Sequence, residues 1–189
     1  LEEALEKVDY GMKILIREGS AAKNFEALHS LITSHTDMVM LCSDDKHPDS
    51  LAIGHLNTVV QRAVAKGHDV LKVLQCACVN PVRHYNLKVG LLQQGDAADF
   101  IVTDSLETFT VLQTYINGKC VAERDTSLLP HHNTTAVNNF SCSPKMESEF
   151  AVKATGNTIR VVEVLDGQLV TNELLVPATI ANGYIQTNT

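Results

Sequence analysis

The sequence predicts an α/β fold, and two patterns in its N-terminal part carry that prediction. Apolar residues at helical spacing alternate twice with short apolar runs that are typical of strands. The second run, residues 38–42 (MVMLC), is apolar throughout, which suits a strand buried on both faces of a parallel sheet. Helix, strand, helix and strand in this order are the alternating units of an α/β domain.

The first four elements follow from this spacing. Residues 1–12 place apolar side chains three and four positions apart, which indicates a helix, and residues 12–16 (MKILI) predict a short strand. Residues 22–34 predict a second helix, and residues 38–42 predict the second strand. Both strands run into polar, charged sequence, where the chemistry of α/β proteins is usually found.

Proline and glycine residues mark the expected boundaries of the next helices. A proline-containing loop is expected over residues 46–50, and residues 51–66 predict one helix. Asp69 is placed to cap another helix over residues 70–79. Pro81 is expected to interrupt that helix and to open a further turn, because proline is favoured at the first helical position.

The character of the sequence changes near residue 89, where strand patterns replace helical ones. Asn117-Gly118 between two strand patterns is a strong hairpin signal, and Asp166-Gly167 predicts a second hairpin. A polar stretch between the hairpins predicts a linker or long loop. The predicted organisation has four parts, residues 1–88, 89–125, 126–146 (the linker) and 147–189.

Composition excludes several classes of partner. The 22 acidic side chains outnumber the 15 basic ones, for a formal charge of −7. Nucleic-acid binding needs a basic face, and attachment to a membrane surface needs a basic segment, so neither partner is expected. No apolar run approaches the roughly 18 residues that span a bilayer. Without a visible secretory signal, a cytoplasmic location is expected, with the five cysteines reduced.

The densest group of reactive side chains is residues 43–49 (SDDKHPD), directly after the second predicted strand. Carboxylates at a strand end can bind a metal ion or transfer a proton. A helix N-cap followed by a solvated turn accounts for the same residues equally well. The spacing of these residues leaves both interpretations open.

A second polar segment, Arg17-Glu18-Gly19-Ser20, follows the first predicted strand. If the two strands are adjacent and parallel, both polar segments lie side by side at one rim. Arg17 is then placed to hold a polar or anionic group of a substrate. A surface ion pair between Arg17 and Glu18, which contributes little, is the alternative.

Four stretches together resemble the adenine deaminase family of the amidohydrolase superfamily. They are LEEALEKVDYGMKILIREGSAAKNFEAL, MLCSDDKHPDSLAIGHLNTVVQRAVAKG, VLQCACVNPVRHYNL and GLLQQGDAADFIVTDSLETFTVLQTYINGKCV. The resemblance covers residues 1–125 and, more weakly, residues 147–176. It implies the C-terminal part of a metal-dependent (β/α)8 barrel in residues 1–88, with about two of its eight strands. A small β-sandwich segment and the start of a C-terminal domain are implied after it.

The resemblance also implies a reaction, the hydrolytic deamination of adenine to hypoxanthine and ammonia by a metal-activated water, as in purine salvage. Asp44 matches the carboxylate at the end of barrel strand eight, which binds metal and shuttles the proton of the attacking water. Asp45, Arg17, Glu18 and Ser20 match positions expected to bind substrate or to support the site. The implied cofactor is a divalent metal, manganese or iron, with zinc as the alternative. The implied partners are adenine and further copies of the chain in a homo-oligomer.

The metal-binding pattern of that family is incomplete in this sequence. Its HxH pair and its middle-strand Glu and His ligands have no counterpart here, and they are expected to precede Leu1. The 189-residue chain alone is therefore expected to be inactive and to expose strand edges. Two alternatives stay open: another deaminase or cyclic amidohydrolase of the superfamily, and a non-catalytic binding module.

Overall fold

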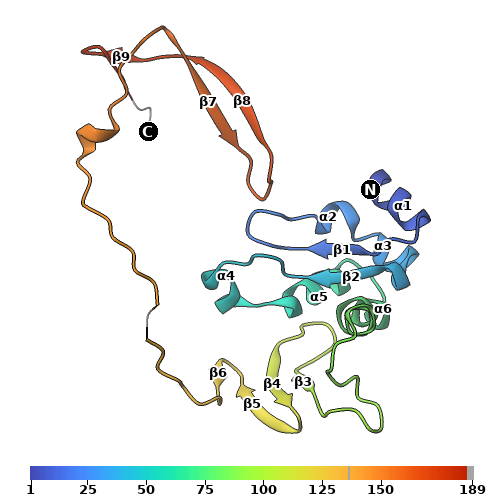
Figure 1. Cartoon of the computed structure of the whole chain (residues 1–189). Coiled ribbons are helices and arrows are strands. Elements are labelled where there is room, and N and C mark those ends of the chain that lie inside the picture. The colour runs from blue at the N-terminus through green and yellow to red at the C-terminus, as the bar shows by residue number, and fades with distance from the viewer. Residues whose placement is uncertain (136, 187–189) are drawn as a thin grey trace. The chain divides into compact units, whose positions relative to one another are not determined.

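The computed structural model describes residues 1–135 and 137–186 (Figure 1). The chain forms two compact units, Leu1–Pro130 and His131–Thr189. The first unit contains helices, a two-stranded parallel sheet and a four-stranded antiparallel sheet, and the second contains two small antiparallel sheets. The first unit is therefore α/β, as predicted, while the boundaries of the four predicted parts stay a prediction.

The parallel sheet consists of β1 and β2, and helices surround it in sequence. The elements up to β2 are α1 (Glu2–Asp9), β1 (Ile14–Arg17), α2 (Phe25–Leu28), α3 (Leu31–Ser34), the 3-10 turn η1 (Thr36–Met38) and β2 (Val39–Cys42). The two strands pair in register, from Ile14 opposite Val39 to Arg17 opposite Cys42. This pairing confirms the predicted alternation of helix and strand, and it confirms that the two strands are adjacent and parallel.

The single helix predicted within residues 22–34 is wrong, because His29 and Ser30 divide it into α2 and α3. Phe25, Leu31 and Ile32 are all buried. On a straight helix, Phe25 and Leu31 would point about 120° apart. Both side chains nevertheless belong to the same core, which fits the interruption of the helix between them.

Four helices and a π-helical turn follow β2. They are α4 (Pro48–Ile53), α5 (Leu56–Ala65), α6 (Val70–Leu74), the π-helical turn η2 (Gln75–Val79) and α7 (Asn80–Tyr85). The predicted loop over 46–50 and the single helix over 51–66 are both wrong. Pro48 stands in the first turn of α4, where its missing N–H costs nothing. Gly54 separates α4 from α5 in an extended conformation, and the Lys46 ammonium donates to its carbonyl oxygen at 2.8 Å.

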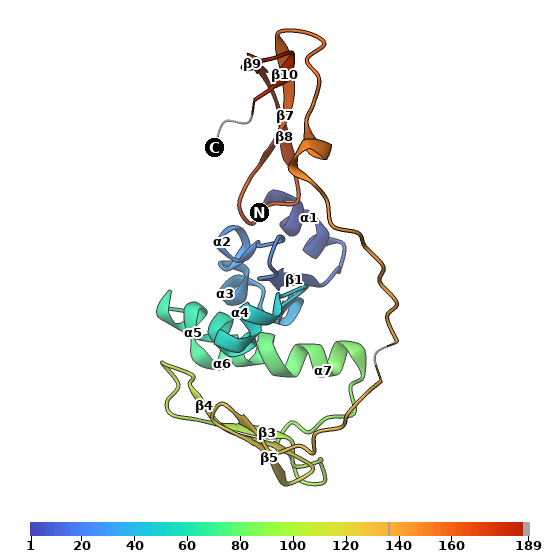
Figure 2. The same ribbon diagram turned by 90° about the vertical axis from the view of Figure 1, so that its left-hand side faces the viewer.

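The helical run from α6 to α7 is continuous (green in Figure 2), so the predicted interruption at Pro81 is also wrong. The further turn that Pro81 was expected to open is confirmed, since Pro81 lies in the first turn of α7, directly after the π-helical turn. Asp69 caps α6 as predicted, and its carboxylate accepts two backbone N–H bonds. The Asn80 amide donates to the carbonyl oxygen of Val39 at 2.7 Å, which ties this helical run to β2.

One hydrophobic core lies among the sheet and the helices of the first unit. Residues Val39, Met40 and Leu41 of β2 are buried, which confirms that this strand is covered on both faces. Burial alternates along β1, where Leu15 is 39% exposed between two buried isoleucines. The largest fully buried side chains are Phe25, Ile16, Leu31, Ile32, Met40, Val39, Val73 and Cys76. The core thus holds the carboxyl ends of both strands in place.

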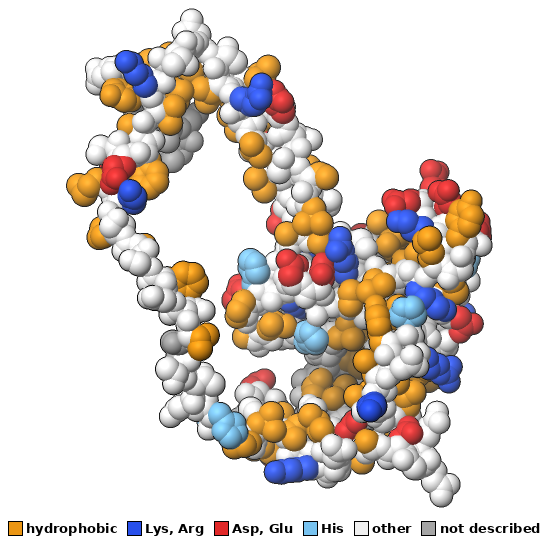
Figure 3. Space-filling view, viewed as in Figure 1, with side chains coloured by type: hydrophobic (Ala, Val, Ile, Leu, Met, Phe, Trp, Pro, Cys, Tyr) orange, Lys and Arg blue, Asp and Glu red, His pale blue; other side chains and the backbone are white. Residues whose placement is uncertain are grey.

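The four-stranded sheet has the order β3-β4-β5-β6. Its strands are β3 (Phe100–Thr103), β4 (Val111–Ile116), β5 (Lys119–Glu123) and β6 (Thr126–Ser127). The predicted hairpin is confirmed, since Asn117 and Gly118 join β4 to β5 with φ angles of 50° and 74°. Phe109 is buried in the core of the helices, and it anchors the sheet there. Figure 3 shows hydrophobic side chains at the surface over β4 and β5.

The second unit holds the other predicted hairpin. Its elements are the 3-10 turn η3 (Glu147–Phe150), β7 (Thr158–Val164), β8 (Thr171–Pro177), β9 (Ile180–Ala181) and β10 (Tyr184–Ile185). β7 pairs with β8 in antiparallel register around the Asp166-Gly167 turn, which confirms that hairpin. Across both units, none of the described helices is long and apolar enough to cross a membrane.

Candidate active site at the carboxyl ends of β1 and β2

The polar segments that follow β1 and β2 lie side by side and are joined by backbone hydrogen bonds. The Glu18 N–H donates to the carbonyl oxygen of Cys42, and the Ser20 N–H donates to that of Asp45, both at 3.3 Å. The two segments therefore share one rim, as the parallel pairing of their strands predicts.

Asp44 follows β2 in a left-handed backbone conformation, with φ of 53°. Few residues other than glycine adopt this conformation, although aspartate tolerates it, and such residues cluster at functional sites. Its Oδ2 accepts a hydrogen bond from Nη1 of Arg17 at 3.2 Å, and the two side chains are 32% and 40% exposed. Asp44 is thus a solvent-accessible carboxylate held beside a permanent positive charge.

The predicted surface pair between Arg17 and Glu18 is wrong. Arg17 pairs with Asp44, whereas Glu18 pairs with Arg62 of α5. Successive side chains at a strand end point to opposite sides, so these two neighbours meet different partners.

Gly19 lets the two loops approach closely, a role that sequence reasoning missed. A Cβ atom at this position would lie 2.6 Å from Oδ1 of Asp45 and 3.0 Å from Cβ of Asp44. Real contacts of this kind are not that short, so any side chain at position 19 pushes the two aspartates away. The close approach is visible only in three dimensions, because 25 residues separate Gly19 from Asp44.

Replacement of Gly19 by alanine is expected to destabilise the first unit by about 1–3 kcal/mol, because the extra methyl group overpacks the loop contact. Urea unfolding of the 189-residue chain measures this change. Gly156→Ala is the matched control, since a Cβ at Gly156 meets nothing within 4 Å. Equal stability of the two variants would contradict the prediction.

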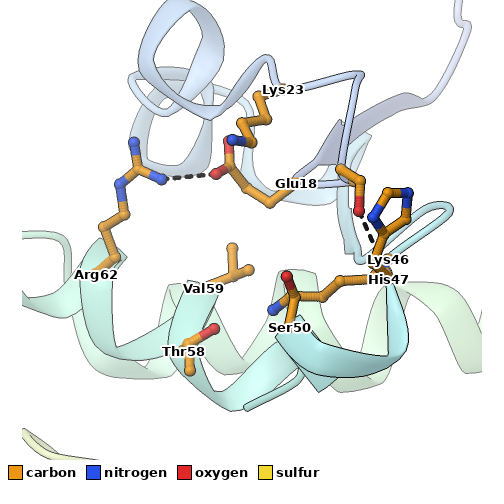
Figure 4. Close-up of a pocket in the computed structure, with 10 residues that line it drawn as sticks. Glu18, Lys23, Lys46, His47, Ser50, Thr58, Val59 and Arg62 are labelled. Carbon is orange, nitrogen blue, oxygen red and sulfur yellow. Dashed lines mark hydrogen bonds and ion pairs between the residues drawn. The ribbon is translucent and has the colours of Figure 1, made fainter. Parts of the chain in front are cut away.

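Glu18 is largely enclosed by the protein, with its side chain 15% exposed. Its Oε1 accepts from the backbone N–H of Phe25 at 3.2 Å, and its Oε2 accepts from Nη1 of Arg62 at 2.7 Å (Figure 4). Both carboxylate oxygens therefore bind groups of the protein itself. Sequence reasoning missed Arg62, which stands 44 positions away on a helix and belongs to no motif.

The SDDKHPD segment leads into the N-terminus of α4, and His47 occupies the N-cap position. The position of the cap therefore agrees with the N-cap interpretation, but no side chain makes a capping bond there, so neither Ser43 nor an aspartate caps the helix. The backbone N–H of His47 donates to the Ser20 hydroxyl at 2.9 Å, which is a further tie between the loops. Ser43 lies 2.8 Å from a ring nitrogen of His55, a contact that sequence reasoning also missed.

A cavity of about 500 Å³ lies between the loop after β1 and helices α4 and α5 (Figure 4). Its lining is Glu18, Gly19, Ser20, Lys23, Lys46, His47, Ser50, Thr58, Val59 and Arg62. Most of these side chains are polar. The structure therefore divides the five predicted site residues: Glu18 and Ser20 line the cavity, whereas Asp44, Asp45 and Arg17 are outside its lining.

The described residues do not form a metal site by themselves. Within residues 1–135 and 137–186, no group of three or more His, Cys, Asp and Glu side chains is arranged to hold a metal ion. Structural and catalytic zinc sites use three or four protein ligands. Asp44 offers one carboxylate, which already pairs with Arg17.

Comparison with known proteins decides the family. The sequence pattern described as the amidohydrolase family matches residues 4–121 of this chain. The chain belongs to the amidohydrolase family. The match includes β1, β2 and the loops that carry Asp44, so the candidate site lies within the family's own domain.

This amidohydrolase is similar in sequence to proteins named adenine deaminase. It is 48% identical over 184 residues to that of Salinibacter ruber, an alignment covering 97% of this chain and 34% of the relative. It is 45% identical over 192 residues to that of Borreliella burgdorferi, covering 100% and 35%. The chain thus spans about a third of the length of the curated relatives it matches.

The amidohydrolase chain also resembles a solved structure. The β-aspartyl dipeptidase of Fervidobacterium islandicum AW-1 superposes with a TM-score of 0.57 at 22% identity. The superposition covers 70% of this chain and 37% of the dipeptidase. At that identity, the likeness concerns the fold alone.

Proposed function

We propose that this amidohydrolase chain is a segment of an adenine deaminase, an enzyme that converts adenine and water to hypoxanthine and ammonia. The observation that carries the proposal is the 48% identity to a protein of that name across 97% of the chain. In this proposal β1 and β2 are the seventh and eighth strands of a (β/α)8 barrel, whose active site is at the carboxyl ends of the strands.

Asp44 is the proposed proton-transfer group. Its carboxylate accepts a proton from the attacking water as the oxygen bonds to the ring carbon that carries the amino group. It then returns a proton to the amine, whose bond to that carbon breaks to release ammonia. The position supports this role, because the core holds the end of β2 rigidly and the side chain is open to solvent. Arg17 donates a hydrogen bond to this carboxylate and thereby holds it at the end of β2.

The other parts of the proposal concern the surroundings of Asp44. Asp45, Arg17, Glu18 and Ser20 stay predicted substrate-side residues, although Glu18 is already bound to Arg62. The divalent metal, manganese, iron or zinc, needs ligands besides Asp44, and we propose that these come from residues outside the present chain. We also propose that the whole enzyme is a homo-oligomer, that it is located in the cytoplasm and that it acts in purine salvage.

Ammonia release tests the proposed function. The whole protein, supplied with Mn²⁺, Fe²⁺ or Zn²⁺, should turn over adenine faster than other purines or cyclic amides. The 189-residue chain with the same metals should release no ammonia, because its described residues hold no metal site. Preference for a cyclic amide would favour another superfamily hydrolase, and inactivity of the whole protein would favour a binding module. Metal-dependent release by the chain alone would contradict the incomplete-site argument.

A further inference from the structure

We propose that Arg62 is a positioning residue, which acts through Glu18 to hold the loop after β1 against the loop that carries Asp44. Of this proposal, only the expected effect of Arg62 on adenine turnover rests on the proposed function. The contacts that carry the inference are made by residues of this chain, and they link α5 to the rim of the sheet.

Three contacts fix the Arg62 guanidinium in place. Its Nη1 donates to Oε2 of Glu18 at 2.7 Å, and its Nη2 donates to Glu26. Its central carbon lies 4.4 Å from the centre of the Phe25 ring, in a cation–π contact. A planar guanidinium can satisfy two carboxylates and a ring face at once, which a lysine ammonium cannot do.

Glu18 depends on this contact. Its side chain is 15% exposed, so little water is available to replace a lost partner. Without Arg62, the backbone N–H of Phe25 is its one remaining hydrogen-bond donor among the described residues. The Glu18 carboxylate is then better hydrated if it turns toward solvent. That movement displaces the backbone of the loop after β1.

The movement reaches Asp44 over a short distance. Gly19 follows Glu18 directly and packs so closely on the Asp44 and Asp45 side chains that a Cβ atom would not fit. The Ser20 N–H bonds to the Asp45 carbonyl, and the Ser20 hydroxyl accepts from His47. A shift of residues 18–20 therefore displaces the Asp44 loop, so Arg62 sets the position of a carboxylate that it does not touch.

Lys66, directly after the end of α5, provides a matched control. Its ammonium pairs with Glu26 at 2.8 Å, and the salt bridges among the described residues link it to no other carboxylate. Loss of Lys66 therefore removes one positive charge and one ion pair to Glu26 but leaves the Glu18 contact intact.

Hydrogen exchange of the whole protein tests the positioning directly, without any need for activity. Arg62→Met should speed exchange of the Phe25, Ser20 and His47 amides by about tenfold or more, because each lies on the tethered loops. Lys66→Met should leave these rates unchanged. If Arg62→Met does not fold, Arg62→Lys replaces it, with a smaller increase expected at the same amides. Wild-type exchange rates in the folded arginine variant would overturn the proposal.

Turnover by the whole enzyme provides the second measurement. Arg62→Met should lower kcat by about 10- to 100-fold, as small misplacements of a catalytic group do. It should also raise the solvent deuterium isotope effect, since proton transfer by a misplaced Asp44 becomes slower. Simple loss of folded protein would lower kcat without changing the isotope effect, and Lys66→Met should change neither. An unchanged kcat and isotope effect in the arginine variant overturns the proposal. Inactivity of the wild-type enzyme toward adenine contradicts the proposed function instead, and hydrogen exchange then decides the role of Arg62.

Discussion

Replacement of Asp44 by asparagine is expected to lower adenine turnover of the whole enzyme by about 10²- to 10⁴-fold, the usual contribution of a general acid–base group. The asparagine amide cannot accept and return the proton of water at neutral pH. Its oxygen can still accept the hydrogen bond from Arg17. Asparagine also tolerates the left-handed backbone of this position, so the fold should persist.

Two controls make the Asp44 prediction decisive. Asp49→Asn removes an exposed carboxylate from the same SDDKHPD segment, in the first turn of α4, and it should keep near-normal turnover. Circular dichroism of both variants should match the wild-type spectrum. Near-normal ammonia release by a folded Asp44→Asn enzyme would exclude Asp44 from proton transfer.

Replacement of Phe25 by alanine is expected to lower the free energy of unfolding by about 3–5 kcal/mol, as for other fully buried phenylalanines. The Phe25 ring is 0% exposed, stacks on His29 with 5.6 Å between ring centroids, and carries the Arg62 guanidinium on its face. A domain's whole stability is about 5–15 kcal/mol, so this loss would remove a large share of the stability of the first unit. Urea unfolding of the 189-residue chain, followed by circular dichroism, measures the change.

Phe140 supplies the matched control for this measurement. Its side chain is 89% exposed, in a stretch of the second unit without helix or strand. Phe140→Ala removes the same group of atoms with almost no burial, and it should change stability by no more than about 0.5 kcal/mol. Similar losses in both variants would contradict the assignment of Phe25 to the core.

Several elements could be predicted from the sequence because their causes are local. Apolar spacing indicated α1, and the short apolar runs indicated β1 and β2. The Asn117-Gly118 and Asp166-Gly167 pairs marked their hairpins, because the backbone of a tight turn depends on the residues within it. The alternation of helix and strand also indicated one shared rim for the two polar segments, on the condition that β1 and β2 are adjacent and parallel, which the structure confirms.

Where helices break could not be predicted from local pattern. α2 separates from α3 so that Phe25 and Leu31 both enter the core, and Gly54 separates α4 from α5 beside the Lys46 ammonium. Conversely, the helical run continues through Pro81. The π-helical turn ends directly before α7, so Pro81 stands in a first turn, where a backbone N–H donor is not required. In each case packing or a distant partner outweighed the local preference.

The sequence by itself determined the α/β class, and its resemblance to the adenine deaminase family selected Asp44 as the candidate carboxylate. The adjacency of β1 and β2 was a condition that the structure confirmed. Only the tertiary structure decided the partners of the charged groups: Arg17 with Asp44, 27 residues away, and Glu18 with Arg62, 44 residues away. The physical reason is that periodicity specifies which side chains share a face. The charged atoms that finally meet depend on how close the packed core brings the loops and α5.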